Sequence, residues 1–315
     1  MKKRWMGILL CSAMTAVICA GIGGTAYAEE DKIVIGLTDA NMSNESNAIF
    51  SNAAIEYAAT MDNVELIVND GEGDAEKQIA QCESFVAQGV DVVIISPYDY
   101  DAACTAAQVC VDAGIPVFVA KGLIADMSLV ETYVGSDDFN AGVIEMNYIA
   151  ELLGGKGNIV IIEGPTGVTG AVLRNDGIAS VLEEYPDIEV LYSQPADWYR
   201  DQAMQLMENW LQLGADINAV VAHNDEMALG AYDALEAAGM ADSVPVIGID
   251  GIQAAVESVG EGKLTASILQ DSKTIAETAI DVAVKIANGE EIEEEYDIPY
   301  QVITIDNYEE FLSEE

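Results

Sequence analysis

From about residue 31 onward, short continuous runs of apolar residues alternate with longer stretches whose apolar positions recur at helical spacing. The first run is Ile33–Leu37, and the first helical stretch covers about 46–60. Because polar positions do not interrupt the runs, they indicate strands buried on both faces, as in a parallel sheet. Glycines close the helical stretches, as at Gly89 and Gly114. The pattern therefore predicts repeated strand–helix–strand units.

The units fall into two successive sets of about five, and the second set begins near Tyr133. Asp138 could cap the first helix of this set, which runs to about Leu153, and a glycine-rich turn follows at 154–157. The other predicted elements are strands at 64–68, 90–96, 116–120, 159–162, 188–192, 219–222, 244–250 and 264–269, helices at 75–88, 102–113, 169–184, 200–213 and 272–288, and an extended segment at 296–305. Two such sets predict an α/β fold of two doubly wound parallel-sheet lobes.

The first 28 residues have the features of a signal peptide. A basic start, Lys2-Lys3-Arg4, precedes an apolar core over 7–22, and Ala26-Tyr27-Ala28 suits cleavage. A membrane anchor is the alternative, but the core is short beside the ~20 apolar residues that a span requires. A lipid anchor stays open, although the residue before Cys19 is not the small residue that a lipoprotein needs. We therefore expect export, to the periplasm or to the outer face of the cell membrane.

Charge and cysteine content narrow the class of partner. The chain has 55 acidic and 12 basic residues, a formal charge of −43, which disfavours nucleic acid and anionic membranes as partners. After the signal peptide the cysteines are Cys82, Cys104 and Cys110, without Cys-x-x-Cys spacing, and the chain has one histidine. We expect buried, unreactive thiols rather than a disulfide framework, and neither a metal site nor a cofactor.

The common catalytic motifs are absent from the sequence. It has no Gly-x-Ser-x-Gly elbow, no Walker loop, and no Gly-x-Gly-x-x-Gly after the first strand. Carboxylates are so numerous that a pair at hydrolase spacing could still arise. An exported α/β enzyme acting on a glycoside therefore remains an alternative to a binding protein.

A polar turn, His223-Asn224-Asp225, follows the apolar run 219–222 and leads into a predicted helix. The carboxyl ends of strands in open α/β sheets are where ligands bind. Asn224 is therefore a candidate ligand contact, although it could equally cap the helix. We expect His223 to be structural.

Four more residues stand at comparable positions and complete a candidate site. Asp250 and Gln270 end predicted strands, Arg174 offers a planar fork of donors, and Trp198 offers a flat apolar face. Each also has a structural alternative, as a turn or loop residue, a surface cation or a core residue. Together with Asn224 they suit a polyol, whose hydroxyls need donors and acceptors and whose C–H face stacks on an aromatic ring.

The first set of units supplies weaker candidates. Ser96 and Lys121 end its third and fourth strands, and Asn44, Ser46 and Asn47 lie in its first strand-to-helix loop. Helix capping and solvation are the alternatives for these residues.

Several motifs resemble the type I periplasmic solute-binding family, in particular the ribose-binding protein group of sugar ABC transporters. The resemblance covers essentially the whole chain after the signal peptide. The motifs are Ser193–Trp198, His223–Gly230, Gly248–Gly251, Ser84–Asp91 and Ile94–Pro97. A sugar-responsive repressor shares this core, but it would need a DNA-binding domain where the signal peptide stands.

The resemblance implies two lobes joined by three crossovers that close on one ligand. The N-terminal lobe would comprise 29–136 plus 271–297, and the C-terminal lobe 137–270 plus 298–315. Ligand contacts would come from Arg174, Trp198, Asn224, Asp250 and Gln270. The protein would act as a monomer that delivers its ligand to an ABC permease, or serve a chemoreceptor or sensor kinase.

Two departures from the family pattern bear on the ligand. The family's Asp-Arg pair after the fourth strand is here Ala120-Lys121, and Asn44 is followed by Glu45-Ser46-Asn47 where the family often has aromatic residues. Phe50 is the next aromatic residue along this helix. The expected ligand is accordingly broad: a mono- or disaccharide, a polyol or a nucleoside.

Overall fold

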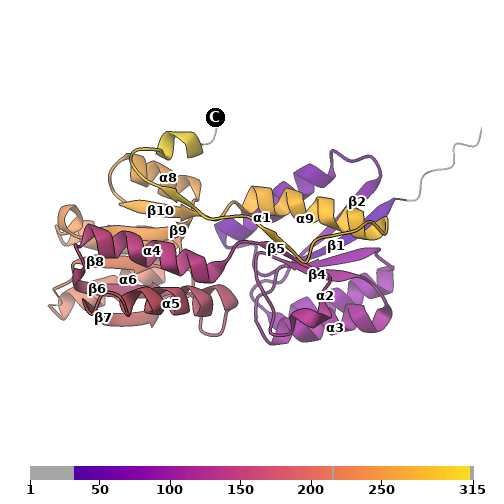
Figure 1. Ribbon diagram of the computed structural model, residues 1–315, viewed down its shortest axis with the longest axis horizontal. Coiled ribbons are helices and arrows are strands. Elements are labelled where there is room, and N and C mark those ends of the chain that lie inside the picture. Colours follow the sequence, from indigo (N-terminus) through magenta and orange to yellow (C-terminus); the bar gives the residue numbers. More distant parts are fainter. Residues whose placement is uncertain (1–31, 215, 313–315) are drawn as a thin grey trace, which may run out of the picture. The chain divides into compact units, whose positions relative to one another are not determined.

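The computed structural model describes residues 32–214 and 216–312. Within these residues the strands form two six-stranded sheets, and helices cover both faces of each sheet (Figure 1). This confirms the predicted α/β fold of two doubly wound lobes. The predicted signal peptide (1–28) and residues 313–315 lie outside the described residues. Of the helices in the described ranges, none is long and apolar enough to cross a lipid bilayer.

The first sheet has the strand order β11-β5-β4-β3-β1-β2, and its neighbouring strands are parallel. Its strands are β1 (Ile33–Asp39), β2 (Val64–Asp70), β3 (Val92–Ile95), β4 (Val117–Ala120), β5 (Tyr133–Gly135) and β11 (Glu295–Asp297). Its helices are α1 (Glu45–Ala58) and α9 (Ser272–Ala287) on one face, and α2 (Ala75–Gln88) and α3 (Ala102–Ala113) on the other. A short 3-10 helix, η1 (Met127–Leu129), lies between β4 and β5.

Each strand of this sheet feeds two cores because successive side chains point to opposite faces. On β3, Val92 and Ile94 join the core beneath α1 and α9, whereas Val93 and Ile95 join the core beneath α2 and α3. All four side chains are fully buried. Burial on both faces explains why the strands read as continuous apolar runs.

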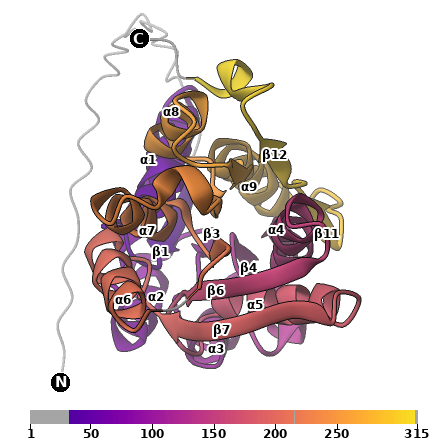
Figure 2. The ribbon, with the colours of Figure 1, turned by 90° about the vertical axis from the view of Figure 1, so that its left-hand side faces the viewer.

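The second sheet has the strand order β12-β10-β9-β8-β6-β7, and its edge strand β12 is antiparallel to β10. Its strands are β6 (Lys156–Glu163), β7 (Asp187–Pro195), β8 (Ala219–Ala222), β9 (Val246–Asp250), β10 (Ala266–Leu269) and β12 (Gln301–Ile303). Helices α4 (Asp138–Leu152) and α5 (Thr169–Leu182) cover one face, and α6 (Arg200–Gln212), α7 (Asp225–Ala237) and α8 (Gln253–Gly260) cover the other (Figure 2). Two 3-10 helices are η2 (Ala241–Ser243) and η3 (Tyr308–Phe311).

The described chain passes between the two sheets at three places: after β5, between β10 and α9, and between β11 and β12. The described chain therefore has the three crossovers that the resemblance implies. We propose these connections as the lobe boundaries, so that 29–136 plus 271–297 and 137–270 plus 298–315 remain the predicted lobes.

Glycines allow close helix packing beneath the second sheet. A Cβ atom on Gly142 of α4 would lie 2.1 Å from the carbonyl oxygen of Arg174 on α5. A Cβ on Gly177 of α5 would lie 2.1 Å from the carbonyl oxygen of Phe139. Since real Cβ contacts are never so short, only glycine permits this approach, which fixes Arg174 against α4.

Some local predictions were wrong. Asp137, not Asp138, caps α4, because its side chain accepts from the backbone N–H groups of Phe139 and Asn140. The predicted turn at 154–157 overlaps β6, which begins at Lys156. The extended segment at 296–305 splits between β11 and β12, in different sheets, and α8 was not predicted. Of the free cysteines, Cys104 is only partly buried.

Candidate functional site

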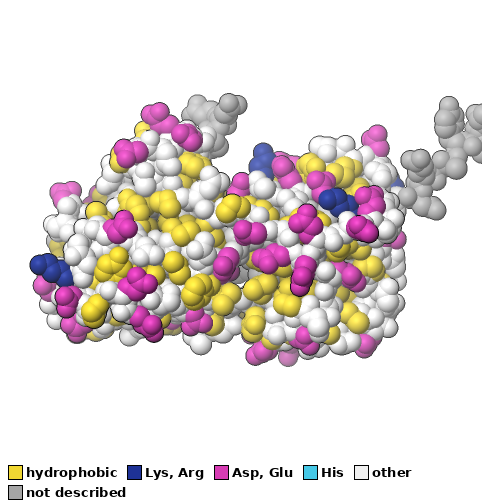
Figure 3. All heavy atoms as spheres, viewed as in Figure 1, with side chains coloured by type: hydrophobic (Ala, Val, Ile, Leu, Met, Phe, Trp, Pro, Cys, Tyr) yellow, Lys and Arg dark blue, Asp and Glu magenta, His cyan; other side chains and the backbone are white. Residues whose placement is uncertain are grey.

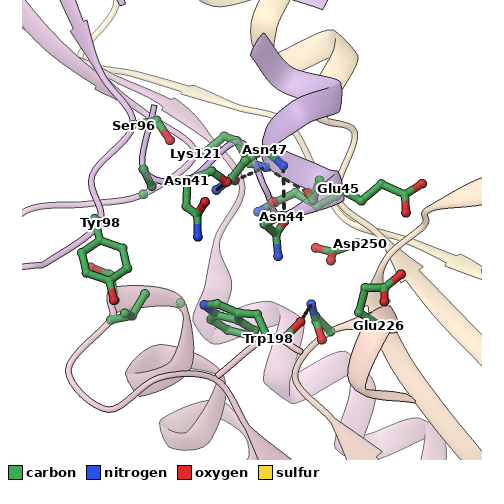
Figure 4. A pocket seen from close by; sticks show the side chains of 18 of the residues that line it. Asn41, Asn44, Glu45, Asn47, Ser96, Tyr98, Lys121, Trp198, Glu226 and Asp250 are labelled. Atoms are coloured by element: carbon green, nitrogen blue, oxygen red, sulfur yellow. Dashed lines mark hydrogen bonds between the residues drawn. The ribbon is translucent and has the colours of Figure 1, made fainter. Parts of the chain in front are cut away.

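The carboxyl ends of the strands open onto a cavity of about 340 Å³. All ten residues singled out from the sequence line it, and they lie in strand ends, loops and helices around both sheets. They are Asn44, Ser46, Asn47, Ser96, Lys121, Arg174, Trp198, Asn224, Asp250 and Gln270. In Figure 4 the Trp198 ring lies on one side of the cavity, and Asn44 and Asn47 lie on the other.

Arg174 is held rigidly at the base of the second-sheet wall. Its Nε donates to Oδ1 of Asp138 at 3.0 Å, and its Nη2 lies 2.8 Å from the same oxygen. Its Nη1 donates to the carbonyl oxygen of His223. Tyr300 donates to Asp138 at 2.8 Å and accepts from Nε2 of Gln270 at 2.8 Å. This buried network joins two site residues, Arg174 and Gln270, through a salt bridge and a phenol.

Asp250 ends β9 in a buried position with a backbone φ of 133°, a region that favours glycine. Burial raises the pKa of this carboxyl group to about 6, although Arg174 and Lys121 act in the opposite direction. The turn after Asp250 is supported by Asp225, whose Oδ2 accepts from the N–H groups of Gly251 at 2.7 Å and Ile252 at 3.1 Å. Asp225 thus supports the wall rather than lining it.

Backbone strain is concentrated around the cavity. Among the described non-glycine residues, φ is positive at Lys121 (64°), Asp197 (54°), Trp198 (71°) and Asp250 (133°), all of which line the cavity, and at Glu72 (54°). Residues in sparsely populated backbone regions cluster at functional sites because the surroundings must hold them there. The strain is therefore independent support for a functional cavity.

Asn224 both caps a helix and lines the cavity, the two roles considered for it from the sequence. Its Oδ1 accepts from the backbone N–H of Met227 at 3.0 Å and so caps α7. Its Nδ2 donates to the carbonyl oxygen of Trp198 at 3.4 Å, at the cavity wall. The helix cap therefore fixes the orientation in which the amide faces the cavity.

The opposite wall is polar and is organised by Lys121. Its Nζ donates to Oγ of Ser46 at 2.9 Å and to Oδ1 of Asn47 at 3.0 Å. Burial lowers the pKa of Lys121 to about 8, and Asp250 and Asp39 partly offset this effect. Asn44 also caps α1, because its side chain accepts from the N–H of Asn47 at 3.4 Å.

Phe50 does not supply an aromatic wall. Its ring is fully buried in the core beneath α1, with Nζ of Lys121 at 5.9 Å from the ring centroid. The aromatic residue that the first lobe does bring to the cavity is Tyr98, two residues beyond Ser96. Its place after a strand end could have marked it in the sequence.

Charged residues at the cavity mouth were also missed. Arg200 donates to Glu226 through Nε at 3.0 Å and through Nη2 at 2.9 Å. Glu45 lines the same region from α1, and burial together with repulsion from Glu226 raises its pKa, against the attraction of Arg200. These side chains come from helix starts, where charged residues are common for other reasons.

His223 lies behind the cavity wall. It is fully buried, its Nδ1 accepts from the N–H of Gly164 at 3.3 Å, and burial and the charge of Arg174 lower its pKa to about 3. The imidazole is therefore neutral. Within the described residues, no group of three or more His, Cys, Asp or Glu side chains is arranged to hold a metal ion.

Comparison with known proteins agrees with this geometry. The periplasmic binding protein domain family matches residues 35–291. A xylitol-binding protein of Mycolicibacterium smegmatis is 37% identical over 91% of this chain and 81% of its own.

Solved structures give the same result. An ABC transporter solute-binding protein from Bacillus halodurans, with bound myo-inositol, is 38% identical with a TM-score of 0.87, covering 90% of this chain and 98% of its own. One from Actinobacillus succinogenes, with bound D-allose, is 35% identical with a TM-score of 0.82, covering 89% and 100%. With its fold, its cavity and these relatives in agreement, the chain belongs to the periplasmic binding protein family.

Proposed function

We propose that this protein captures a polyhydroxylated small molecule of one ring in its cavity and delivers it to an ABC importer. The observation that carries the proposal is the convergence of Arg174, Asn224, Asp250 and Gln270 with the Trp198 ring on one cavity. Relatives described as binding xylitol, myo-inositol and D-allose support a sugar or polyol as the ligand class.

The residue types match the chemistry of such a ligand. Asp250 accepts two hydrogen bonds from hydroxyl groups, while Arg174 and Gln270 donate to hydroxyl oxygens. Trp198 covers the C–H face of a ring. On the other side of the cavity, Lys121 and Asn47 present polar groups to the ligand. An aromatic residue in their place would instead favour a ligand with a second apolar face. A ring with hydroxyls directed toward this polar wall, such as a cyclic polyol, fits both walls.

The size of the cavity favours a single ring. Its volume of about 340 Å³ stands at the low end of the roughly 300–1,000 Å³ of small-molecule pockets. We therefore rank monosaccharides and cyclic polyols above disaccharides and nucleosides.

Binding is coupled to conformation because the ligand contacts come from both lobes. A ligand that touches both walls stabilises the conformation in which the walls are close, by the difference in its affinity for the two states. The importer would recognise that conformation. We further propose that the protein is exported by its signal peptide and acts as a monomer.

The protein is a binding protein and not an enzyme. Its relatives are binding proteins, and two of the acids that line the cavity are paired with cations, Asp138 with Arg174 and Glu226 with Arg200. A bound ligand is accordingly expected to be recovered unchanged.

A thermal-shift screen tests the proposal. Purified protein would be heated with monosaccharides, cyclic and acyclic polyols, disaccharides and nucleosides. A ligand at 100 times its Kd stabilises the fold by about 2.7 kcal/mol, so a true ligand raises the Tm clearly. We expect the largest shifts from single-ring polyols, calorimetric binding of one molecule per chain, and no product by mass spectrometry. Shifts from nucleosides alone, or a product, would overturn the proposal.

A further inference from the structure

The Trp198 ring rests directly on the backbone of Gly164, the residue that follows β6. A Cβ atom on Gly164 would lie 2.1 Å from Cη2, 2.3 Å from Cζ2 and 2.6 Å from Cζ3 of Trp198. Trp198 lines the cavity, whereas Gly164 is not among the lining residues. The glycine therefore lies behind the ring, and its missing side chain lets the ring sit back from the cavity.

The backbone of Trp198 is held in place separately from its ring. Asp197 and Trp198 have φ values of 54° and 71°, and the Trp198 carbonyl accepts from Nδ2 of Asn224 at 3.4 Å. The N–H of Ala196 donates to the carbonyl of Glu163 at 2.9 Å, which ties this turn to the end of β6. Because the backbone is fixed in this way, a side chain added at Gly164 would move the ring of Trp198 and not its backbone.

His223 holds Gly164 in turn. Its Nδ1 accepts from the Gly164 N–H at 3.3 Å, and the backbone N–H of His223 donates to the carbonyl of Ile162 at 3.0 Å. Its carbonyl accepts from Arg174, whose Cζ lies 5.6 Å from the centroid of the Trp198 ring. His223 thus contacts the support of the ring through its imidazole and the guanidinium beside the ring through its backbone carbonyl.

We infer that Gly164 and His223 are positioning residues for the ligand. Together they set the depth of the Trp198 ring, and hence the width of the slot between this ring and the polar wall formed by Asn44 and Asn47 (Figure 4). The slot admits one ring with a C–H face on Trp198. The inference rests on the proposed function, since it concerns the same cavity.

The variant Gly164→Ala tests the inference. The new methyl group displaces the far end of the tryptophan side chain into the slot, and affinity for the best polyol from the screen falls by about tenfold or more. In the ligand-free protein, tryptophan fluorescence and its quenching by acrylamide change as well, with Trp198→Phe identifying the contribution of this ring. The second readout needs no ligand, so it separates failure of this inference from failure of the proposed function.

Gly260→Ala is the matched control. Its Cβ would lie 2.3 Å from Cε2 of Tyr308, another aromatic ring, at the contact between α8 and η3 and away from the cavity lining. This variant is expected to lose stability while affinity and Trp198 quenching stay unchanged.

A double-mutant cycle decides whether Gly164 acts through Trp198. The smaller ring of Trp198→Phe leaves room for the methyl group, so Gly164→Ala costs less than about threefold in affinity in that background. For His223, His223→Asn keeps an acceptor near the Gly164 N–H and retains affinity better than His223→Leu. Equal losses from Gly164→Ala in both backgrounds, or unaltered Trp198 quenching in the ligand-free variant, would overturn the inference.

Discussion

At the scale of single residues, Asp250 combines the features that a ligand contact requires. Its backbone lies in a region that favours glycine, it is buried, and it faces two cations, Arg174 and Lys121. The backbone conformation and the burial of a carboxylate are each unfavourable, and the two cations partly offset the cost of burial. Their combination at the end of β9 indicates that the carboxylate is kept there for a ligand.

The titration of Asp250 should make affinity depend on pH. Burial raises its pKa to about 6, against the opposing charges of Arg174 and Lys121 and with added repulsion from Asp138. Below this pH the carboxyl group loses its charge and one of its oxygens becomes a donor, so it accepts hydrogen bonds from hydroxyls more weakly. We therefore expect Kd to rise as pH falls from 7.5 to 5, by up to about tenfold. Lys121, with a pKa of about 8, stays mostly protonated over this range.

Calorimetry on Asp250→Asn provides the test of this assignment. The variant should bind the same ligand about tenfold or more weakly at pH 7.5, and its remaining affinity should vary much less between pH 7.5 and 5. Asp101→Asn is the control, because Asp101 is exposed and its side chain does not cap α3. A pH dependence that persists in Asp250→Asn would assign the titration to another group.

At the scale of elements, some boundaries could be read from local sequence because local interactions set them. The predicted helices 75–88 and 102–113 match α2 and α3, since Gly89 (φ 69°) and Gly114 (φ 74°) end them in the left-handed conformation. The start of β6 was missed because Gly154, Gly155 and Gly157 suggested a turn, whereas pairing with β7 from Lys156 onward extends the strand. The residues around a strand end do not reveal pairing with a strand that is distant in the sequence.

The candidate site divides in the same way. Asn224, Asp250 and Gln270 could be predicted because each follows a buried strand, where an α/β sheet places ligands. Glu45 and Glu226 could not be predicted. The chain has so many acidic residues that the sequence does not indicate which of them lie close together at the cavity mouth. The role of Gly164 likewise depends on a contact with Trp198 across two strand ends.

The close packing of α4 on α5 predicts a large effect of a single methyl group. In Gly142→Ala the Cβ would lie 2.1 Å from the carbonyl oxygen and 2.9 Å from the carbonyl carbon of Arg174, and backbone atoms cannot yield as a side chain can. We expect a loss of stability of about 2 kcal/mol or more, together with weaker ligand binding because α5 carries Arg174. Urea denaturation followed by circular dichroism measures the first effect, and calorimetry the second.

Gly170→Ala on the same α5 serves as the comparison. Its Cβ would lie 3.5 Å from Oδ2 of Asp138, an ordinary contact, and alanine favours a helix over glycine by about 1 kcal/mol. Its unfolding midpoint should equal or exceed that of the unchanged protein. A similar loss of stability in both variants would show that the close approach of α4 and α5 is not what makes Gly142→Ala destabilising.

At the scale of the whole molecule, the dominant property is charge. The formal charge is −43, and in Figure 3 acidic side chains are spread over the visible face while basic ones are sparse. The described surface ion pairs include Lys77–Glu72 and Lys263–Glu261, which join close neighbours in sequence. Because acidic residues outnumber basic ones 55 to 12, repulsion among carboxylates opposes the compact state.

Screening this repulsion should stabilise the protein. The Debye length falls from about 30 Å at 0.01 M salt to about 10 Å at 0.1 M, so added salt weakens repulsion between separated carboxylates more than it weakens buried pairs such as Arg174–Asp138. We expect the Tm of the ligand-free protein to rise by at least about 2 °C between 10 and 300 mM NaCl, the shift that ~1 kcal/mol produces in a chain of this size. Choline chloride should act equally, because screening depends on ionic strength. A rise with sodium alone would indicate a bound cation, and a fall would show that surface attraction outweighs repulsion.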